Sequence, residues 1–145
     1  MEQGAYYITD NLGVEMALGG LNATLRDYAK LGRLYLNKGN WEGKQIVPKS
    51  WVAQSTHSTE EHLLPQSENS ETRGLGYGFQ WWIPEGTEGE FMAVGVFNQF
   101  IYINPTTNTI IVKNSANKNY YDDKNPYRSI FVHLELFRKL AHSND

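Results

Sequence analysis

The chain has 145 residues, of which 40% are apolar and 13% aromatic, so it fits a single globular domain with its own core. A net charge of -3 and a pI near 5.8 argue against a nucleic-acid partner and against binding to an anionic membrane surface. The absence of cysteine excludes disulfides and thiolate metal sites, and no apolar run approaches the roughly 20 residues of a membrane span.

The opening residues, MEQGAYYITD, contain neither a basic segment nor an apolar one, so the chain as written carries no secretion signal. A protein without cysteine is compatible with a reducing or an oxidising compartment. The localisation therefore stays open between the cytoplasm, for the chain as written, and the periplasm, for a longer parent protein.

Residues 1–56 form a predicted helical segment. Thr24 and Asp27 have the spacing of a capping box at a helix start, and Gly39 is a typical helix stop. Gly32 within this helix costs about 1 kcal/mol relative to alanine, which indicates close packing against a neighbour. A second, short helix is expected to open at Pro48. Apolar residues of the first helix recur at helical intervals, at Leu25, Tyr28, Leu31, Leu34 and Tyr35.

Residues 57–74 are polar and aperiodic, and they are predicted to form a loop or flap beside a substrate cleft.

Residues 75–145 are predicted to form an antiparallel sheet of three or four strands with a C-terminal helix on one face, an α/β fold of the α+β type. Pro105 in NPTTN is typical of a tight hairpin turn. Glu135 and Lys139 are expected to pair on the polar face of the last helix. The apolar stripe of that helix comprises Tyr127, Ile130, Phe131, Leu134, Phe137 and Ala141.

No metal or cofactor is expected. The four histidines, His57, His62, His133 and His142, do not have a compact ligand spacing, and they are interpreted as solvated surface residues. No glycine-rich loop followed by Lys-Ser or Lys-Thr is present, so nucleotide binding has no support.

Two short matches to catalytic motifs are interpreted as coincidences. Ser115 and Lys118 have the S-x-x-K spacing of a lysine-activated serine, but they stand in a polar stretch after a strand instead of at the start of a buried helix. Tyr35 and Tyr102 each begin a Y-x-N triplet, one in a predicted helix and one in a predicted strand. Both tyrosines are expected to be packing residues.

The order of several blocks resembles the C-terminal part of the beta-lactamase-related serine hydrolases. That superfamily includes class C beta-lactamases, D-alanyl-D-alanine peptidases, EstB-type esterases and 6-aminohexanoate-oligomer hydrolases. The resemblance extends over nearly the whole chain and implies a partial beta-lactamase-like fold. The blocks are GGLNATLRDYAKLGRLYLNKGNWEGKQIVPKSWV at residues 19–52, then GYGFQWWIP, then FMAVGVFNQFIYINPTTNTIIVK.

The resemblance also implies a site. AVGVFNQ, residues 93–99, matches the sheet segment nearest the catalytic serine. In this mapping Gly95 lets the substrate approach, and the backbone N–H of Val96 is the second oxyanion donor. Further pocket candidates are Phe97, Asn98, Gln99, Leu18 and Gly19. In the alternative reading, Gly95 is a bulge in an inert strand.

The resemblance implies that most of the family's catalytic residues are absent from this chain. The family's S-x-x-K serine and lysine and its Y-x-N tyrosine precede the first block, so the chain is expected to be inactive alone. If the missing N-terminal part were supplied, the chain would act on a small ester or amide. Beta-lactamases carry a K-T-G motif on the strand nearest the serine, and here no lysine or histidine takes the place of its lysine. Beta-lactams that bear a carboxylate are therefore disfavoured as substrates. An incomplete sheet should also expose an edge and self-associate.

A stand-alone binding or structural module is the alternative from another functional class. In that interpretation, four aromatic residues form a platform for a sugar or a peptide: Tyr77, Trp81, Trp82 and Phe97.

Overall fold

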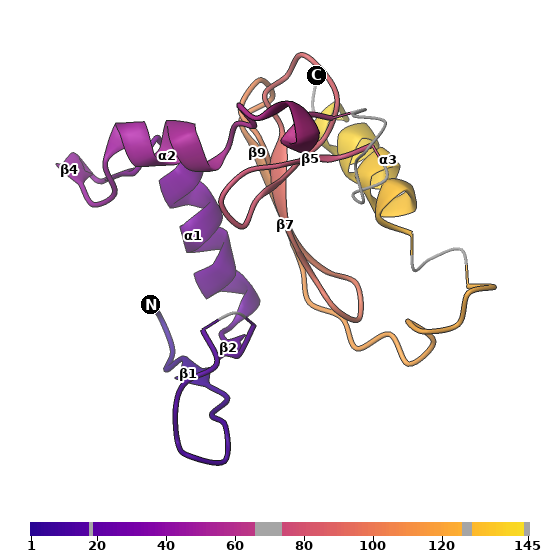
Figure 1. Cartoon of the computed structure of the whole chain (residues 1–145). Helices are drawn as coiled ribbons and strands as arrows, with labels where there is room; N and C mark the ends of the chain where they lie inside the picture. Colours follow the sequence, from indigo (N-terminus) through magenta and orange to yellow (C-terminus); the bar gives the residue numbers. More distant parts are fainter. Residues whose placement is uncertain (18, 66–73, 126–128, 144–145) are drawn as a thin grey trace.

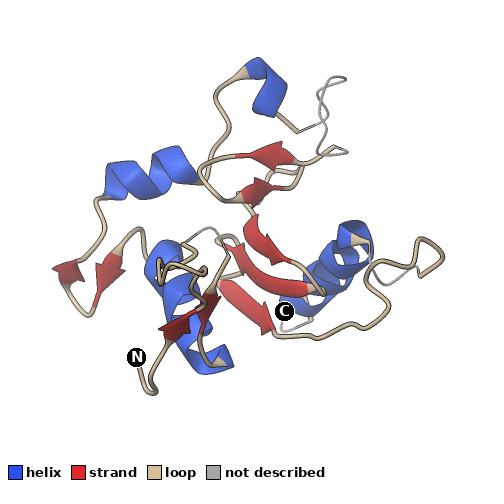
Figure 2. Ribbon diagram, turned by 60° about the horizontal axis from the view of Figure 1, so that its bottom comes forward, coloured by secondary structure: helices blue, strands red, loops and turns tan. Residues whose placement is uncertain are grey.

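The computed structural model describes residues 1–17, 19–65, 74–125 and 129–143. Helix α1 (Leu25–Leu36) lies on one face of an antiparallel sheet and helix α3 (Ile130–Ala141) on the other (Figures 1 and 2). The predicted α+β class, with a C-terminal helix on the sheet, is confirmed. The five strands follow the order β5 (Gly76–Tyr77), β6 (Trp82–Ile83), β7 (Phe91–Gly95), β8 (Gln99–Asn104) and β9 (Thr109–Lys113).

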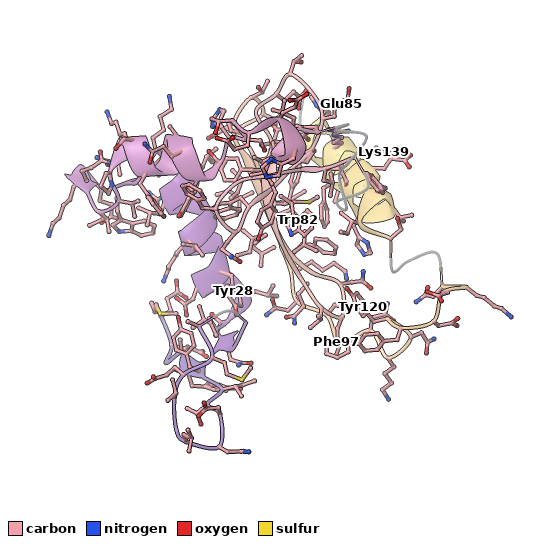
Figure 3. The ribbon with its side chains drawn as sticks, in the orientation of Figure 1. Tyr28, Trp82, Glu85, Phe97, Tyr120 and Lys139 are labelled. Carbon is pink, nitrogen blue, oxygen red and sulfur yellow. The ribbon has the colours of Figure 1, made fainter. Side chains whose placement is uncertain are left out.

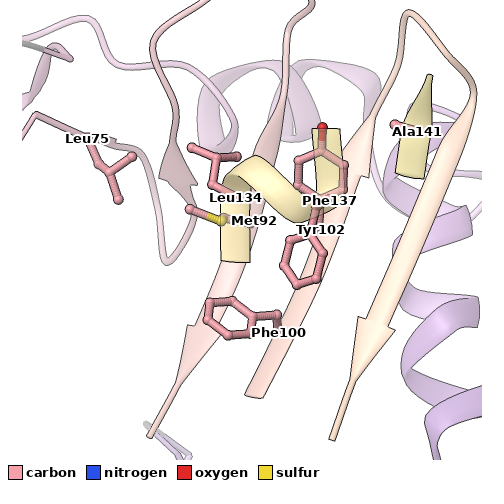
Figure 4. Packing of buried hydrophobic residues seen from close by; sticks show 7 residues of the cluster. All are labelled: Leu75, Met92, Phe100, Tyr102, Leu134, Phe137 and Ala141. Carbon is pink, nitrogen blue, oxygen red and sulfur yellow. The ribbon is translucent and has the colours of Figure 1, made fainter. Parts of the chain in front are cut away.

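Alternation along β8 builds a core on each face of the sheet. Phe100 and Tyr102 point toward α3, where they pack with Met92, Leu134 and Phe137 (Figure 4). Ile101 and Ile103 point the other way and form a second cluster with Trp81 and Phe91, against which Tyr28 and Tyr35 of α1 pack. The sheet is therefore buried on both faces.

Among the described residues the sheet has five strands instead of the three or four that were expected, because GYGFQWWIP is not one strand. The chain turns back after Tyr77, where Gln80 adopts a φ of 66° and the Gly78 N–H donates to the Trp81 carbonyl at 2.8 Å. A side chain at Gly78 would lie 2.0 Å from the Ser55 carbonyl oxygen, so the turn packs directly on the preceding helix. Glycine is required there for this close approach.

Helix α1 begins at the predicted capping box. Thr24 Oγ1 accepts from the Asp27 N–H at 3.2 Å, and it donates to the Asp27 carboxylate at 3.0 Å. Gly32 fits against the sheet as expected, since a Cβ there would lie 2.8 Å from Ile110 Cγ2. The expected apolar stripe is only partly buried: Leu25 and Leu31 are 46% and 37% exposed, because the helix approaches the sheet along the line of Gly32.

Helix α3 follows the predicted pattern with one exception. Leu134, Phe137 and Ala141 are buried, and Lys139 pairs with Glu135 at 2.6 Å. Phe131 is exposed, and Tyr127 lies outside the described residues.

The interpretation of His133 as a solvated residue is wrong. Its side chain is buried and stacks on the Phe100 ring, with 4.7 Å between ring centroids. Its Nδ1 lies 3.0 Å from the Ser129 carbonyl oxygen. His133 lies one helical turn before Phe137, and the centroids of the two rings are 6.1 Å apart, so the imidazole packs beside the apolar stripe of α3.

The remaining elements are short. Pro48 precedes α2 (Lys49–Ser55), as predicted. The 3-10 turn η1 (Glu61–Leu63) lies in the predicted polar loop, whose residues 66–73 fall outside the described part, so the flap stays a prediction. Among the described residues, no helix has the length and apolarity needed to cross a membrane. Two small hairpins are formed by β1 (Tyr6–Tyr7) with β2 (Leu21–Asn22) and by β3 (Asn40–Trp41) with β4 (Lys44–Gln45).

Candidate active site: the tip of the β7–β8 hairpin

The strand that carries Gly95 is regular to its end. Antiparallel pairing of β7 with β8 continues without interruption from Phe91 opposite Ile103 to Gly95 opposite Gln99. The alternative reading of Gly95 as a bulge is therefore wrong. A Cβ at Gly95 would lie 3.2 Å from Gln99 Cβ, so glycine also relieves crowding between the two strands.

The outer edge of β7 is open near the tip. Strand β6 pairs with β7 only at Trp82 opposite Met92, which leaves the edge from Ala93 to Gly95 without a strand partner among the described residues. Val96 follows directly and is 52% exposed. Across the described part of the chain, its backbone N–H makes no hydrogen bond. An extended substrate could pair with this edge and place an oxygen at that N–H.

The turn beyond Val96 has an unusual backbone. Phe97 and Asn98 adopt φ values of 61° and 64°, in the left-handed region that bulky residues rarely occupy. Asn98 is 2% exposed, whereas Phe97 is 37% exposed. The Phe97 ring meets Tyr120 edge-on at 5.8 Å between centroids, and Figure 3 shows the two side by side at the end of the hairpin.

A lysine reaches this turn from the neighbouring strand. Lys113 lies opposite Phe100 in the β8–β9 pairing, and its Nζ donates to the Asn98 carbonyl oxygen at 2.8 Å. Burial lowers the pKa of Lys113. The sequence shows no lysine or histidine beside Gly95, and this cation was missed because it stands 15 residues after Asn98.

A pocket of about 530 Å³ opens beside the turn, on the α3 side of the sheet. It lies between the tip of the hairpin and the segment that joins β9 to α3. Half of its eight described lining residues are asparagines: Asn98, Asn117, Asn119 and Asn125, together with Lys113, Ser115, Ala116 and His133.

The predicted site residues fall into two groups. Gly95 ends β7, and Val96, Phe97 and Asn98 form the turn that follows it. Gln99 begins β8, and its side-chain Nε2 donates to the Val96 carbonyl oxygen at 3.4 Å. Gly19 is exposed in the turn before β2, which pairs with β1 and not with the central sheet. Leu18 lies outside the described residues.

The S-x-x-K and Y-x-N matches lie in surroundings that agree with their interpretation as coincidences. Ser115 lies in a segment without regular secondary structure and Lys118 in a turn, so the pair does not share a helix. Tyr35 packs against Trp81 and Phe91, and Tyr102 is fully buried. Within the described residues, no group of three or more histidine, aspartate or glutamate side chains could hold a metal ion.

The four aromatic residues of the alternative binding module do not form one platform. Trp81 is buried in the cluster beneath α1, whereas Trp82 packs against the cluster beneath α3 and meets Tyr77 edge-on. Phe97 belongs to the hairpin tip, with Tyr120 and Tyr121.

Comparison with known proteins bears on this site. The chain is 36% identical to a solved Bacillus anthracis protein described as a candidate 6-aminohexanoate-dimer hydrolase, with a TM-score of 0.81 over 98% of this chain and 34% of that one. It is 28% identical over 116 residues to the 6-aminohexanoate-dimer hydrolase of Paenarthrobacter ureafaciens, covering 79% of this chain and 30% of the relative. A candidate beta-lactamase from Bacteroides dorei has the same fold, at 20% identity and a TM-score of 0.50 over 77% of this chain and 38% of that one.

The chain thus spans about a third of the length of these relatives. The model of the beta-lactamase family matches residues 2–136, which is most of the sequence. Both the sequence and the structural likeness agree with the resemblance carried by AVGVFNQ and its neighbouring blocks. The chain belongs to the beta-lactamase family, within the beta-lactamase-related serine hydrolases.

Proposed function

We propose that this chain supplies the carbonyl-binding edge of a serine hydrolase that cleaves ester or amide bonds. The substrate lies along the open edge of β7, and the Val96 N–H donates to the carbonyl oxygen as negative charge develops on it. The observation that carries the proposal is the edge from Ala93 to Gly95, which has no strand partner among the described residues. It leads into Val96, a half-exposed residue whose backbone N–H has no partner among the described residues.

We further propose that the attacking serine, its lysine base and the leaving-group tyrosine come from outside this chain. Ser115 and Lys118 do not stand on one helix, as the S-x-x-K arrangement needs. Tyr35 and Tyr102 are used in packing. Because rate in this chemistry depends on an activated nucleophile, the chain alone should not turn over substrate.

The preferred substrates in this proposal are amides and esters that need no carboxylate anchor. Two relatives carry the name of 6-aminohexanoate-dimer hydrolases, which favours a linear amide. Lys113 donates to a backbone carbonyl of the turn instead of standing on the open edge of β7. A beta-lactam carboxylate therefore has no evident partner on that edge.

The test uses a completed hydrolase, in which this chain is joined to the part of the Bacillus anthracis protein that it does not cover. Turnover of p-nitrophenyl esters and of the 6-aminohexanoate dimer is measured for two variants. Val96→Pro removes the N–H and should lower kcat about 100- to 1000-fold. Val96→Ala keeps the N–H and should lose much less. Equal rates for the two variants, with folding verified by circular dichroism, would refute the oxyanion role.

The nucleophile is tested on the chain alone with a serine-directed fluorophosphonate. No labelling and no hydrolysis above background are expected. Labelling that disappears in Ser115→Ala would show that the nucleophile lies within this chain.

We also propose that the chain associates with itself. Among the described strands, β9 pairs only with β8, so its other edge is open to a further strand. Sedimentation velocity should show concentration-dependent association of the chain, which is reduced in the completed hydrolase. A compact monomer at every concentration would contradict this proposal.

A further inference from the structure

The tip of the β7–β8 hairpin is held in a conformation that its own residues do not favour. A turn with positive φ at two successive positions matches the twist of the strands, but it is usually built from Asn-Gly or Gly-Gly. Here the two positions are Phe97 and Asn98. Asparagine tolerates this region, whereas for an aromatic residue it costs of order 1–2 kcal/mol. Interactions from elsewhere in the fold must therefore stabilise the turn.

Those interactions come from the end of β9 and the segment after it. Lys113 Nζ donates to the Asn98 carbonyl oxygen at 2.8 Å, and Asn117 Nδ2 donates to Asn98 Oδ1 at 2.6 Å. The Asn117 backbone N–H lies 3.4 Å from the Phe97 carbonyl oxygen. Two residues outside the hairpin thus contact both residues with positive φ.

The same contacts occupy several of the polar groups that line the adjoining pocket. Three of its polar side chains, Lys113, Asn117 and Asn98, hydrogen-bond within or onto the turn. Asn125 Nδ2 donates to the Asn119 carbonyl oxygen at 3.1 Å. The polar groups therefore join the β9–α3 segment to the hairpin and to itself, which favours a mechanical role over recognition of a small anion.

We propose that Lys113 and Asn117 are positioning residues that fix the β7–β8 turn and thereby aim the Val96 N–H. Their target, Asn98, is two residues from Val96, and the turn must close between the paired residues Gly95 and Gln99. We therefore expect a change in the φ of Phe97 or Asn98 to be compensated at Val96, which reorients its peptide group relative to the edge of β7. The catalytic consequence rests on the proposed oxyanion role of Val96. The positioning itself does not depend on that role.

The first experiment measures the turn directly, in the chain alone. In ¹H–¹⁵N spectra, Lys113→Met and Asn117→Ala should shift or broaden the amide signals of Val96, Phe97 and Asn98. The three-bond HN–Hα couplings of Phe97 and Asn98 should move away from values for positive φ. Lys118→Met is the matched control, because this lysine is exposed in the same segment. Signals of residues 96–98 that match the control in both variants would overturn the proposal.

A rescue experiment separates positioning from general destabilisation. Glycine adopts positive φ without the steric cost. Phe97→Gly, added to Lys113→Met, should therefore return the Val96 and Asn98 amide signals toward those of Phe97→Gly alone. Loss of stability without local rescue would show that Lys113 acts only on the fold.

The catalytic arm uses the completed hydrolase. Lys113→Met should lower kcat roughly 10- to 100-fold with little change in KM, because a misplaced donor weakens the transition state more than the ground state. Changed Val96 signals together with an unchanged kcat would remove Val96 from the oxyanion site and leave the positioning intact. Unchanged amide signals of residues 96–98 would overturn the positioning role of Lys113, whatever the value of kcat.

Discussion

The two ends of the β7–β8 hairpin differ in how their polar groups are used. At the base, Glu90 is 4% exposed; Arg138 contacts its carboxylate through Nε at 2.9 Å and Nη2 at 2.5 Å, and the Tyr102 hydroxyl donates to it as well. At the tip, Val96 is half-exposed and its backbone N–H has no partner in the described part of the chain. Satisfied groups stabilise a fold, whereas an unsatisfied N–H in a fixed place can bind a ligand.

The base also fixes the neighbouring turn. Asn104 is fully buried; its Oδ1 accepts from the backbone N–H groups of Thr106 and Thr107 at 2.9 and 3.1 Å, and its Nδ2 donates to Glu88 at 2.5 Å. Burial and the adjacent Glu90 raise the pKa of Tyr102, so its hydroxyl stays protonated as a donor. We infer that the base supplies the rigidity on which the position of the tip depends.

The largest stability effect is expected at the base, for Ile103→Ala. This side chain is 0% exposed, and its removal loses apolar burial and leaves a cavity beneath α1. The free energy of unfolding should fall by about 3–4 kcal/mol. Urea denaturation measures this loss. A change below about 1 kcal/mol would mean that the α1 face of the sheet is not the packed core that the structure describes.

Arg138→Ala should be next, with a loss of about 2–3 kcal/mol in urea denaturation, because it leaves the buried Glu90 carboxylate without its cation. This loss is smaller than the roughly 3–5 kcal/mol typical of fully buried pairs, because Arg138 is itself 39% exposed. The neighbouring Lys139→Ala is the matched control. It breaks only the exposed pair with Glu135 and should cost at most about 0.5 kcal/mol. Equal losses of stability in the two variants would show that the buried pair with Glu90 contributes no more than the exposed pair with Glu135.

A smaller, pH-dependent effect is expected for Glu88 at the base. The hydrogen bond from Asn104, and then the nearby His142, lower the pKa of Glu88 below its ordinary value of 4.5. A depressed carboxyl pKa contributes stability that is present above the ordinary value and is lost as the pH falls through the folded-state pKa. Glu88→Gln should therefore lower stability at neutral pH and flatten its decline in acid.

Urea midpoints measured from about pH 7 to about pH 3 test this effect, with the exposed Glu15→Gln as the control. An acid decline as steep in Glu88→Gln as in the unmodified chain would show that Glu88 contributes nothing to it.

The smallest stability effect is expected at the tip, for Val96→Ala. The side chain is half exposed and leaves no buried cavity, so the urea midpoint should correspond to a change within about 0.5 kcal/mol. A loss of stability near that of Ile103→Ala would show that Val96 is part of the core and that the tip of the hairpin does not differ from its base in packing.

Local patterns in the sequence determined much of the scaffold. Thr24 and Asp27 predicted the start of α1, because a capping box depends only on residues within one turn. Gly32 indicated a close approach, which α1 makes to Ile110. The blocks around AVGVFNQ predicted the family, and the five candidate residues from Gly95 to Gln99 lie together at the tip of the hairpin because they are adjacent in the chain.

Only the tertiary structure decided which distant residues meet at the site. The helical pattern around His133 does not show whether its side chain is exposed to solvent or stacked on another ring. Its burial follows from the placement of α3 across Phe100. Lys113 and Asn117 reach Asn98 because β9 returns antiparallel beside β8 and brings its end to the tip of the hairpin. The hydrogen bonds from Lys113 and Asn117 to Asn98 join residues that are 15 and 19 positions apart, and no local propensity records such a contact.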